Sequence, residues 1–197
     1  MSNGKSLSKS GCRFRLQLSG GFLLLLSLTG FLCGTEALFT AVMAACAHEL
    51  GHLVLILKQG SLPTVLRLDA SGASLRCIGP EPDFLQELAR ALAGPAAGLL
   101  LWLLLYGSGN SFLRTVAGMS LMLSLVNLLP APGLDGGRVL DCLLTGVMKA
   151  DRWHRFSSWL GFLSALLTLS LGIFRSPQLF LYGIWLLLRQ IRIRLHN

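Results

Sequence analysis

A series of long apolar blocks, separated by short polar segments, limits what this chain can fold into more than any other feature. The blocks cover about residues 16–33, 37–57, 88–106, 112–129 and 157–174, and a shorter apolar run covers 179–188. Strands usually have only about 3–10 residues, whereas a helix needs roughly 20 apolar residues to cross a bilayer. The blocks therefore predict membrane-spanning helices.

The composition supports this interpretation. Hydrophobic residues make up 53% of the 197 residues and charged residues only 13%, whereas soluble domains carry about 25% charged residues. The net charge is +8, but the basic residues lie between apolar blocks instead of gathering with aromatic residues on a soluble face. That distribution is typical of a protein oriented in a membrane and not of a nucleic-acid-binding protein. We expect no nucleic-acid partner.

The positions of the basic residues also predict a topology. If the N-terminus is cytoplasmic and all six apolar runs cross, only Arg114 and Arg175 of the 17 lysines and arginines fall outside. If the run 179–188 did not cross, three arginines would move outside, against the positive-inside rule. We therefore expect a multi-pass protein of the cell membrane with both termini in the cytoplasm. Its parts would be a basic tail (1–15), a six-helix domain (16–190) and a short cytoplasmic tail (191–197).

The first apolar block has an alternative interpretation. A basic segment followed by an apolar run is also the layout of a cleaved signal peptide. No small-x-small cleavage site follows the block cleanly, and a cut before Cys33 would want a small residue where Leu32 stands. We interpret 16–33 as a retained helix.

The polar segment after the second block predicts a small β-hairpin at about 62–78. Residues 64–68 and 73–78 alternate between apolar and polar or small side chains, and Asp-Ala-Ser-Gly between them is typical of a turn. The expected fold class is therefore an all-α polytopic membrane protein with about six transmembrane helices and a small membrane-associated β-hairpin.

The second block contains His48-Glu49-Leu50-Gly51-His52. On a helix, residues i and i+4 lie on the same face, so His48 and His52 can bind one metal ion. Glu49 beside them can act as a general base on a metal-bound water, and imidazole ligands suit zinc. The alternative is a structural cluster of polar residues between helices. Because His and Glu are costly inside a membrane, they usually mark function there.

A zinc site of this kind needs a third protein ligand. His154 and His196 lie in polar segments without a supporting motif, and Asp135 is the better candidate. Asp135 lies just after the fourth block, in Asn-Leu-Leu-Pro-Ala-Pro-Gly-Leu-Asp-Gly. In the expected topology this turn and the histidines lie at one depth near the cytoplasmic face. The alternative is a plain cytoplasmic turn in which Asp135 caps a helix.

These two motifs together resemble the site-2 protease family of intramembrane metalloproteases. The resemblance rests on His48-Glu-Leu-Gly-His52 and Asn127-x-x-Pro-x-Pro-x-Leu-Asp135-Gly, and on Ala-Gly-Pro at 93–95 between them. It covers about residues 16–190, and the hairpin resembles the membrane-associated β-element of that family. The compact plan, with the metal motif on the second helix, is most similar to the sporulation-type bacterial branch.

The resemblance implies a function and the roles of individual residues. It implies one Zn²⁺ per chain bound by His48, His52 and Asp135, with Glu49 as the catalytic base. It also suggests that Asn127 assists at the scissile carbonyl or orients the substrate, although a helix-end cap is an equal alternative for this residue. The alternative functions are a metal-ion transporter and a non-catalytic metal-binding membrane protein.

The expected activity is that of a zinc metalloendopeptidase in regulated intramembrane proteolysis, which hydrolyses peptide bonds in or near transmembrane segments. The implied partners are a membrane-anchored protein substrate, the lipid bilayer and regulatory membrane proteins.

Overall fold

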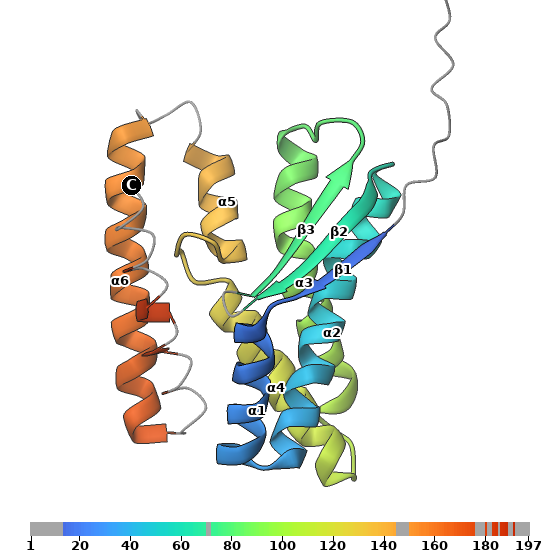
Figure 1. Cartoon of the computed structure of the whole chain (residues 1–197), viewed down its shortest axis with the longest axis vertical. Coiled ribbons are helices and arrows are strands. Elements are labelled where there is room, and N and C mark those ends of the chain that lie inside the picture. Colours follow the sequence, from blue (N-terminus) through green and yellow to red (C-terminus); the bar gives the residue numbers. More distant parts are fainter. Residues whose placement is uncertain are drawn as a thin grey trace, which may run out of the picture.

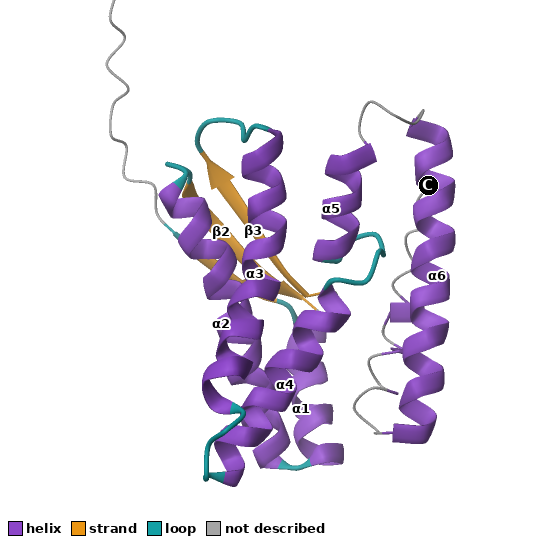
Figure 2. Ribbon diagram, turned by 180° about the vertical axis from the view of Figure 1, so that it is seen from behind, coloured by secondary structure: helices purple, strands orange, loops and turns teal. Residues whose placement is uncertain are grey.

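The computed structural model describes residues 14–69, 72–144 and 150–175, together with 180, 183–184, 186–188 and 191. Helices and one small sheet make up this part of the chain (Figures 1 and 2). In chain order, the elements are β1 (Arg15–Leu18), α1 (Gly20–Cys33), α2 (Thr35–Lys58), β2 (Leu62–Asp69), β3 (Gly72–Ile78), α3 (Phe84–Leu105), α4 (Ser111–Asn127), α5 (Asp135–Leu144) and α6 (Ala150–Arg175).

Five of the apolar blocks coincide with helices α1 to α4 and α6, so the largely helical fold and the hairpin are confirmed. The basic tail lies almost wholly outside the described residues, and so do 192–197 and much of the run 179–188. Several element boundaries differ from the sequence predictions, and α3 and α6 begin before their apolar blocks, at Phe84 and Ala150. Residues 15–18 form a strand, so the first helix begins at Gly20 and not at 16, and an unpredicted helix, α5, begins at Asp135.

The sheet has three strands in the order β1-β2-β3. The hairpin strands β2 and β3 are antiparallel, with Leu66 opposite Leu75. β1 adds to the other edge of β2 in parallel, with Arg15 opposite Val65. The segment 15–18 was missed because its alternating Arg-Leu-Gln-Leu leads directly into the apolar helix. The central strand β2 is therefore paired on both sides.

Local signals explain where the helices begin. The Ser19 side chain accepts a hydrogen bond from the Phe22 backbone N–H and caps α1, and the Asn110 side chain caps α4 in the same way. At α3, Asp83 and Gln86 form a reciprocal capping box. Gly34, which has a φ of 87°, allows the sharp turn between α1 and α2.

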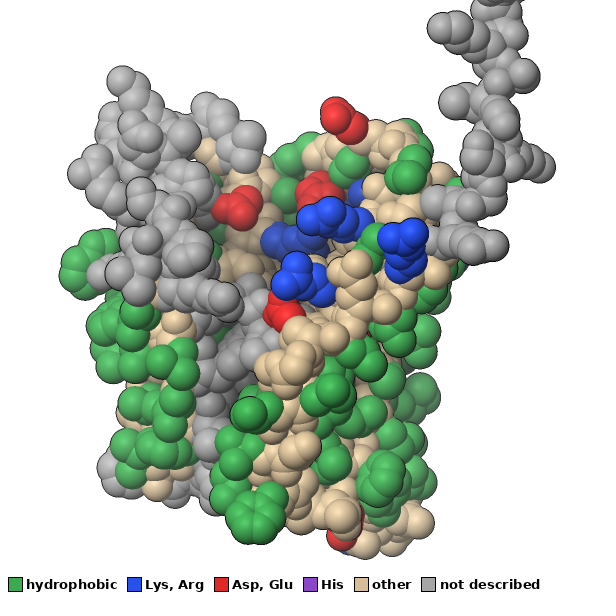
Figure 3. Space-filling model, viewed as in Figure 1, with side chains coloured by type: hydrophobic (Ala, Val, Ile, Leu, Met, Phe, Trp, Pro, Cys, Tyr) green, Lys and Arg blue, Asp and Glu red, His purple; other side chains and the backbone are tan. Residues whose placement is uncertain are grey.

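Two helices, α2 and α3, are long and apolar enough to cross a membrane by length and composition. The helices α1 and α4, and residues 156–170 of α6, are shorter apolar segments. Many large side chains on these helices are exposed to the surroundings, including Leu24 at 67% and Leu104 at 70%. Such an exposed apolar surface suits contact with lipid. Figure 3 shows basic side chains gathered over the sheet and hydrophobic side chains below them.

The helices α2, α3 and α4 pack through small residues. Ala44, Ala91 and Ala117 of these helices are buried, and Gly98 of α3 lies directly against Ser124 of α4. Small residues let helix backbones approach closely in a membrane protein. The last turn of α4 leads into the segment 128–134, from which Ala131 and Leu134 pack in one apolar cluster with Ala165 and Leu186. This packing fixes the segment that leads into α5, whose first residue, Asp135, lies beside His48 of α2.

Candidate metal centre

His48 and His52 lie one helical turn apart on α2. Their Nε2 atoms are 3.2 Å apart and their ring centroids 4.9 Å apart. The helix backbone alone accounts for this proximity, because residues i and i+4 share a face. The predicted histidine pair is therefore present on one face of α2.

Asp135 reaches the histidines from α5. Its position depends on Gly136 and Gly137, which press against the backbone of the segment 128–131. A Cβ atom at Gly137 would lie 2.8 Å from the Ala131 carbonyl carbon, and one at Gly136 would collide with Leu128 in the same way. The two glycines thus let the first turn of α5 fold back onto the proline-containing segment, which sets Asp135 over α2.

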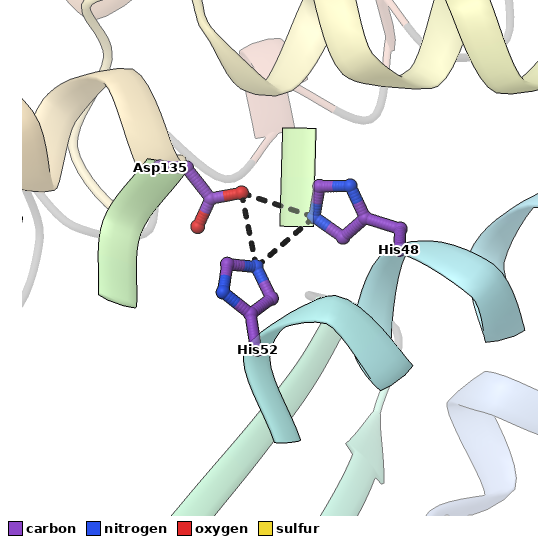
Figure 4. A group of neighbouring side chains, drawn as sticks. All are labelled: His48, His52 and Asp135. Atoms are coloured by element: carbon purple, nitrogen blue, oxygen red, sulfur yellow. Dashed lines mark hydrogen bonds and ion pairs between the residues drawn. The ribbon is translucent and has the colours of Figure 1, made fainter. Parts of the chain in front are cut away.

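Three side chains converge on one point (Figure 4). The Asp135 Oδ2 atom lies 3.0 Å from His48 Nε2 and 3.3 Å from His52 Nε2. His48 and Asp135 are buried, with 4% and 7% exposure. Within the part of the chain that the structure describes, this is the group of His, Cys, Asp and Glu side chains that could hold a metal ion.

Helix α3 forms one wall of the group. Gly94 faces both histidines, and a Cβ atom at this position would come within 2.7 Å of His48 Nε2 and would also collide with His52. Gly51 brings the two helices together in the same region, because an added Cβ would meet Ala93 and lie 2.6 Å from Ala97 Cβ. The absence of a side chain at Gly94 therefore leaves the space in which the imidazole nitrogens face Asp135.

The hydrogen bond of His52 Nδ1, which points away from the metal-binding group, determines which ring nitrogen carries the proton. His52 Nδ1 lies 2.8 Å from the Arg90 carbonyl oxygen. Because a carbonyl can only accept, Nδ1 carries the proton, and a neutral His52 presents its Nε2 lone pair to Asp135. Asp135 Oδ2 is buried there and accepts no hydrogen bond.

A lone pair and a carboxylate oxygen facing each other in a buried site repel unless a cation, either a proton or a metal ion, lies between them. Two imidazole nitrogens and one carboxylate also match the donor set of catalytic zinc sites. Burial raises the pKa of Asp135, but its interactions with His48 and His52 outweigh burial and hold that pKa at about 2. The carboxylate is therefore ionised at neutral pH, as a metal ligand must be. The residues present fit a zinc ion.

The two residues predicted to act in catalysis lie at different places. Glu49 follows His48 on α2 and is half-buried, within electrostatic reach of both histidines, Asp135 and Arg138 of α5. Asn127 ends α4, where its Nδ2 donates a hydrogen bond to the Leu123 carbonyl oxygen at 3.0 Å. The structure thus brings Glu49 to the metal-binding group and leaves the amide of Asn127 bonded within its own helix.

Sequence reasoning missed Arg90 as a neighbour of the site. Its carbonyl orients His52, and its side chain donates hydrogen bonds to Gln59 and to Ser61. No motif surrounds Arg90. The one feature of the sequence that could have indicated its role is its position: Arg90 lies one turn before the Ala-Gly-Pro element, and the helix residues after it are apolar or small.

Comparisons with known proteins agree with this geometry. Residues 110–171 match Peptidase family M50, a segment that includes Asn127 and Asp135. A Synechocystis sp. protein described as a candidate zinc metalloprotease is 35% identical over an alignment of 181 residues, which covers 80% of this chain and 45% of that protein. A zinc metalloprotease of Methanocaldococcus jannaschii is 28% identical over an alignment of 149 residues, which covers 66% of this chain and 43% of that protein. The chain thus spans less than half the length of these curated relatives.

The fold has a solved counterpart. The site-2 protease from Methanocaldococcus jannaschii superposes with a TM-score of 0.66 at 22% sequence identity, covering 90% of this chain and 89% of that chain. Residues 110–171 of this chain thus match peptidase family M50, and the described chain has the fold of a site-2 protease.

Proposed function

We propose that this chain is an intramembrane zinc metalloendopeptidase that hydrolyses peptide bonds in or near the transmembrane segments of membrane-anchored proteins. The observation that carries the proposal is the convergence of His48 Nε2, His52 Nε2 and Asp135 Oδ2 beside Glu49. A metal-ion transporter would also use intramembrane His and Asp. It would have no need of a carboxylate next to the metal ligands as a base.

In the proposed reaction the three converging side chains hold the zinc ion, and each catalytic side chain has one task. When bound, zinc polarises the scissile carbonyl and lowers the pKa of water towards neutrality. Glu49 accepts the proton of the attacking water and can return it to the leaving amine. Asn127 would have to exchange its bond with the Leu123 carbonyl for one with the substrate, where its amide could stabilise the developing oxyanion.

The sheet supports a proposal for how the substrate is presented. A helical substrate keeps its carbonyls in internal hydrogen bonds, so the segment to be cut must be extended. Because β2 is paired with both β1 and β3, only the outer edges of β1 and β3 can accept a further strand. We favour the outer edge of β3, since an extended substrate segment can add to a sheet edge by main-chain hydrogen bonds.

The membrane arrangement belongs to the same proposal. Six spans with both termini in the cytoplasm would place the sheet and the metal-binding group towards the cytoplasmic face. Substrates would then reach the zinc from the cytoplasmic half of the bilayer. Regulatory membrane proteins could act by controlling access to the sheet. This arrangement fits regulated intramembrane proteolysis.

The proposal is tested with purified protein and a membrane-anchored substrate, by following cleavage after chelation and after addition of zinc. Cleavage should stop with chelator and return with zinc. Glu49→Gln should keep one zinc per chain and lose cleavage by about 10²-fold or more, because the amide preserves the shape but cannot accept the proton. The matched control is Glu36→Gln, which changes an exposed carboxylate in the first turn of the same helix.

The outcomes separate the candidate functions. Zinc binding without cleavage of any membrane substrate would favour the transporter or the non-catalytic protein. Cleavage by Glu49→Gln at a rate near that of the wild-type protein would remove Glu49 from the role of base, whatever its zinc content.

A further inference from the structure

Arg90 connects three parts of the molecule next to the metal-binding group. Its Nε donates a hydrogen bond to Gln59 Oε1, and its Nη2 donates to Ser61 Oγ at 2.9 Å. Gln59 follows the last residue of α2, and Ser61 precedes the first residue of β2. One side chain of α3 thus holds both the end of the metal-binding helix and the start of the sheet.

The connection is built from buried or half-buried groups. Ser61 is only 2% exposed, and Arg90 and Gln59 are half-buried. Gln59 also uses its Nε2 to donate to the Gln86 carbonyl oxygen at 3.2 Å, so both ends of its amide bind α3. Gly79, the residue after β3, lies against Ser61, and a Cβ there would be 2.7 Å from Ser61 Cα. The two ends of the hairpin therefore meet where the Arg90 side chain binds.

The charge of Arg90 is not used in an ion pair. Among the described residues, no carboxylate lies within ion-pair distance of its guanidinium, and both partners are neutral acceptors. A planar group with several fixed donors is suited to holding two acceptors at once. Its role in the structure is thus geometric, since it fixes the relative position of α2, α3 and the sheet.

The main chain of the same residue contacts the metal-binding group. The Arg90 carbonyl oxygen accepts the hydrogen bond from His52 Nδ1 at 2.8 Å. Partners of this kind set the orientation and the tautomer of a histidine ligand. Because Gly94, one turn further along α3, touches both imidazoles, a small shift of α3 against α2 would change both contacts together.

We propose that Arg90 is a positioning residue for the metal centre: its side chain clamps α3 to α2 and to the sheet, and thereby holds its own carbonyl against His52. This inference rests on the proposed zinc site and extends it. It implies that the positions of the sheet and the metal centre are coupled through Arg90. A displacement of the sheet would then weaken the hydrogen bond that orients the His52 ring.

The test uses cobalt in place of zinc, because the visible spectrum of Co²⁺ reports the ligand geometry without any proteolysis. Arg90→Met removes the donors and keeps an apolar stem. We expect it to bind one Co²⁺ per chain with an altered visible spectrum and about 10–100-fold weaker affinity for Co²⁺ and Zn²⁺. In cleavage assays kcat should fall, while KM changes little. Arg90→Lys, which can still donate to one acceptor, should recover part of the spectrum and affinity.

The matched control is Arg76→Met, which removes an exposed arginine of β3. It should leave the cobalt spectrum and the affinity as in the wild-type protein. Gln59→Leu and Ser61→Ala each remove one acceptor of the clamp and should shift the spectrum in the same direction as Arg90→Met. These two variants decide the question if Arg90→Met does not fold.

Wild-type cobalt spectra and affinities in Arg90→Met, or in both acceptor variants, would overturn the inference. Altered cobalt spectra in these variants together with an inactive wild-type protein would instead support the clamp and count against the proposed protease function. The cobalt measurements therefore separate failure of the clamp from failure of the proposed activity.

Discussion

At the residue scale, the metal-binding group combines two histidines from one helix with an aspartate from another. His48 and His52 are held together by one turn of α2, so their proximity costs little beyond helix formation. Asp135 reaches them from another helix and is buried beside an imidazole lone pair, with its Oδ2 accepting no hydrogen bond. A buried carboxylate without a compensating cation is costly. The negative charge of Asp135 is therefore balanced by a metal ion when one is bound, and by the histidines when none is.

Asp135→Ala is expected to lose the metal without losing the fold. Zinc affinity should fall by at least about 100-fold, because even outer partners of metal ligands are worth roughly 10–100-fold. The metal-free protein should lose some thermal stability at neutral pH, because a carboxylate whose pKa is held at about 2 is more stable when ionised in the folded protein than in the unfolded chain. Metal analysis and thermal unfolding measure the two effects.

Asp141→Ala in the same helix is the control, and it should retain one zinc per chain. If Asp135→Ala also retained its zinc, the third ligand would have to be sought elsewhere in the chain.

Site residues could be predicted when the residues they contact are close to them in the sequence, and were harder to predict when those contacts come from distant segments. The histidine pair and Glu49 were predicted from five consecutive residues, because their relation is set within one helix. Asp135 was chosen from its motif and its expected depth, and the structure brings it to the histidines. Arg90 could not be predicted, because its carbonyl and side chain act across the interface between α2 and α3, which no local pattern records.

At the element scale, the contact between α2 and α3 decides whether the group can exist. The helices meet where Gly51 of α2 lies against Ala93 and Ala97, one turn or less from Gly94. Pro95 is buried at the same level inside α3. This close approach leaves no room for a side chain in front of the imidazoles.

Gly94→Ala is therefore expected to destroy the metal site although it improves the helix. Alanine is favoured over glycine inside a helix by about 1 kcal/mol. The added methyl group would nevertheless lie within 2.7 Å of His48 Nε2 and against His52, so the rings would have to move apart. Zinc content should fall well below one per chain while the helical circular dichroism signal is kept.

Gly118→Ala provides the control, because a Cβ at Gly118 of α4 would meet nothing within 4 Å. This variant should bind zinc normally and be as stable as the wild-type protein or slightly more stable. Normal zinc binding by Gly94→Ala would mean that α3 does not press on the histidines as the structure has it.

The elements themselves were predictable where one periodicity ran long enough. The helices α2, α3, α4 and α6 follow from their apolar blocks, and the hairpin follows from alternation around a turn. β1 has only four residues and forms a strand because it pairs with β2, which is distant in the sequence. α5 was not predicted, because its residues belong to a polar segment. Gly136 and Gly137 also have low helix propensity, whereas in the structure they pack on residues 128–131 in the first turn of a helix.

At the scale of the whole molecule, the arrangement has two distinct ends. Figures 1 and 2 show the α1–α2 and α3–α4 connections at one end and the sheet with α5 towards the other. Exposed arginines, among them Arg15, Arg67 and Arg76, lie on the sheet. Few charges accompany the opposite end, where Glu36 and Arg114 lie near the helix starts. From the positive-inside rule we expect the sheet to lie on the cytoplasmic side of the bilayer.

The last prediction concerns how many times the chain crosses the membrane. The helices α2 and α3 have 24 and 22 residues, about 36 and 33 Å at 1.5 Å per residue, which exceeds the roughly 30 Å hydrocarbon core. α1 and α4 have only 14 and 17 residues, about 21 and 26 Å, so they can cross only if the bilayer thins or flanking residues extend them. Their alternation with α2 and α3 in the fold nevertheless places their ends at opposite sides.

Reporter proteins fused at positions 110 and 176 should therefore be located outside the cell, and reporters fused at 70, 145 and 197 should be located in the cytoplasm. A fusion at 197 that reads outside would mean that the run 179–188 does not cross. A fusion at 110 that reads inside would contradict the crossing of α3 and, with it, the cytoplasmic placement of the metal centre.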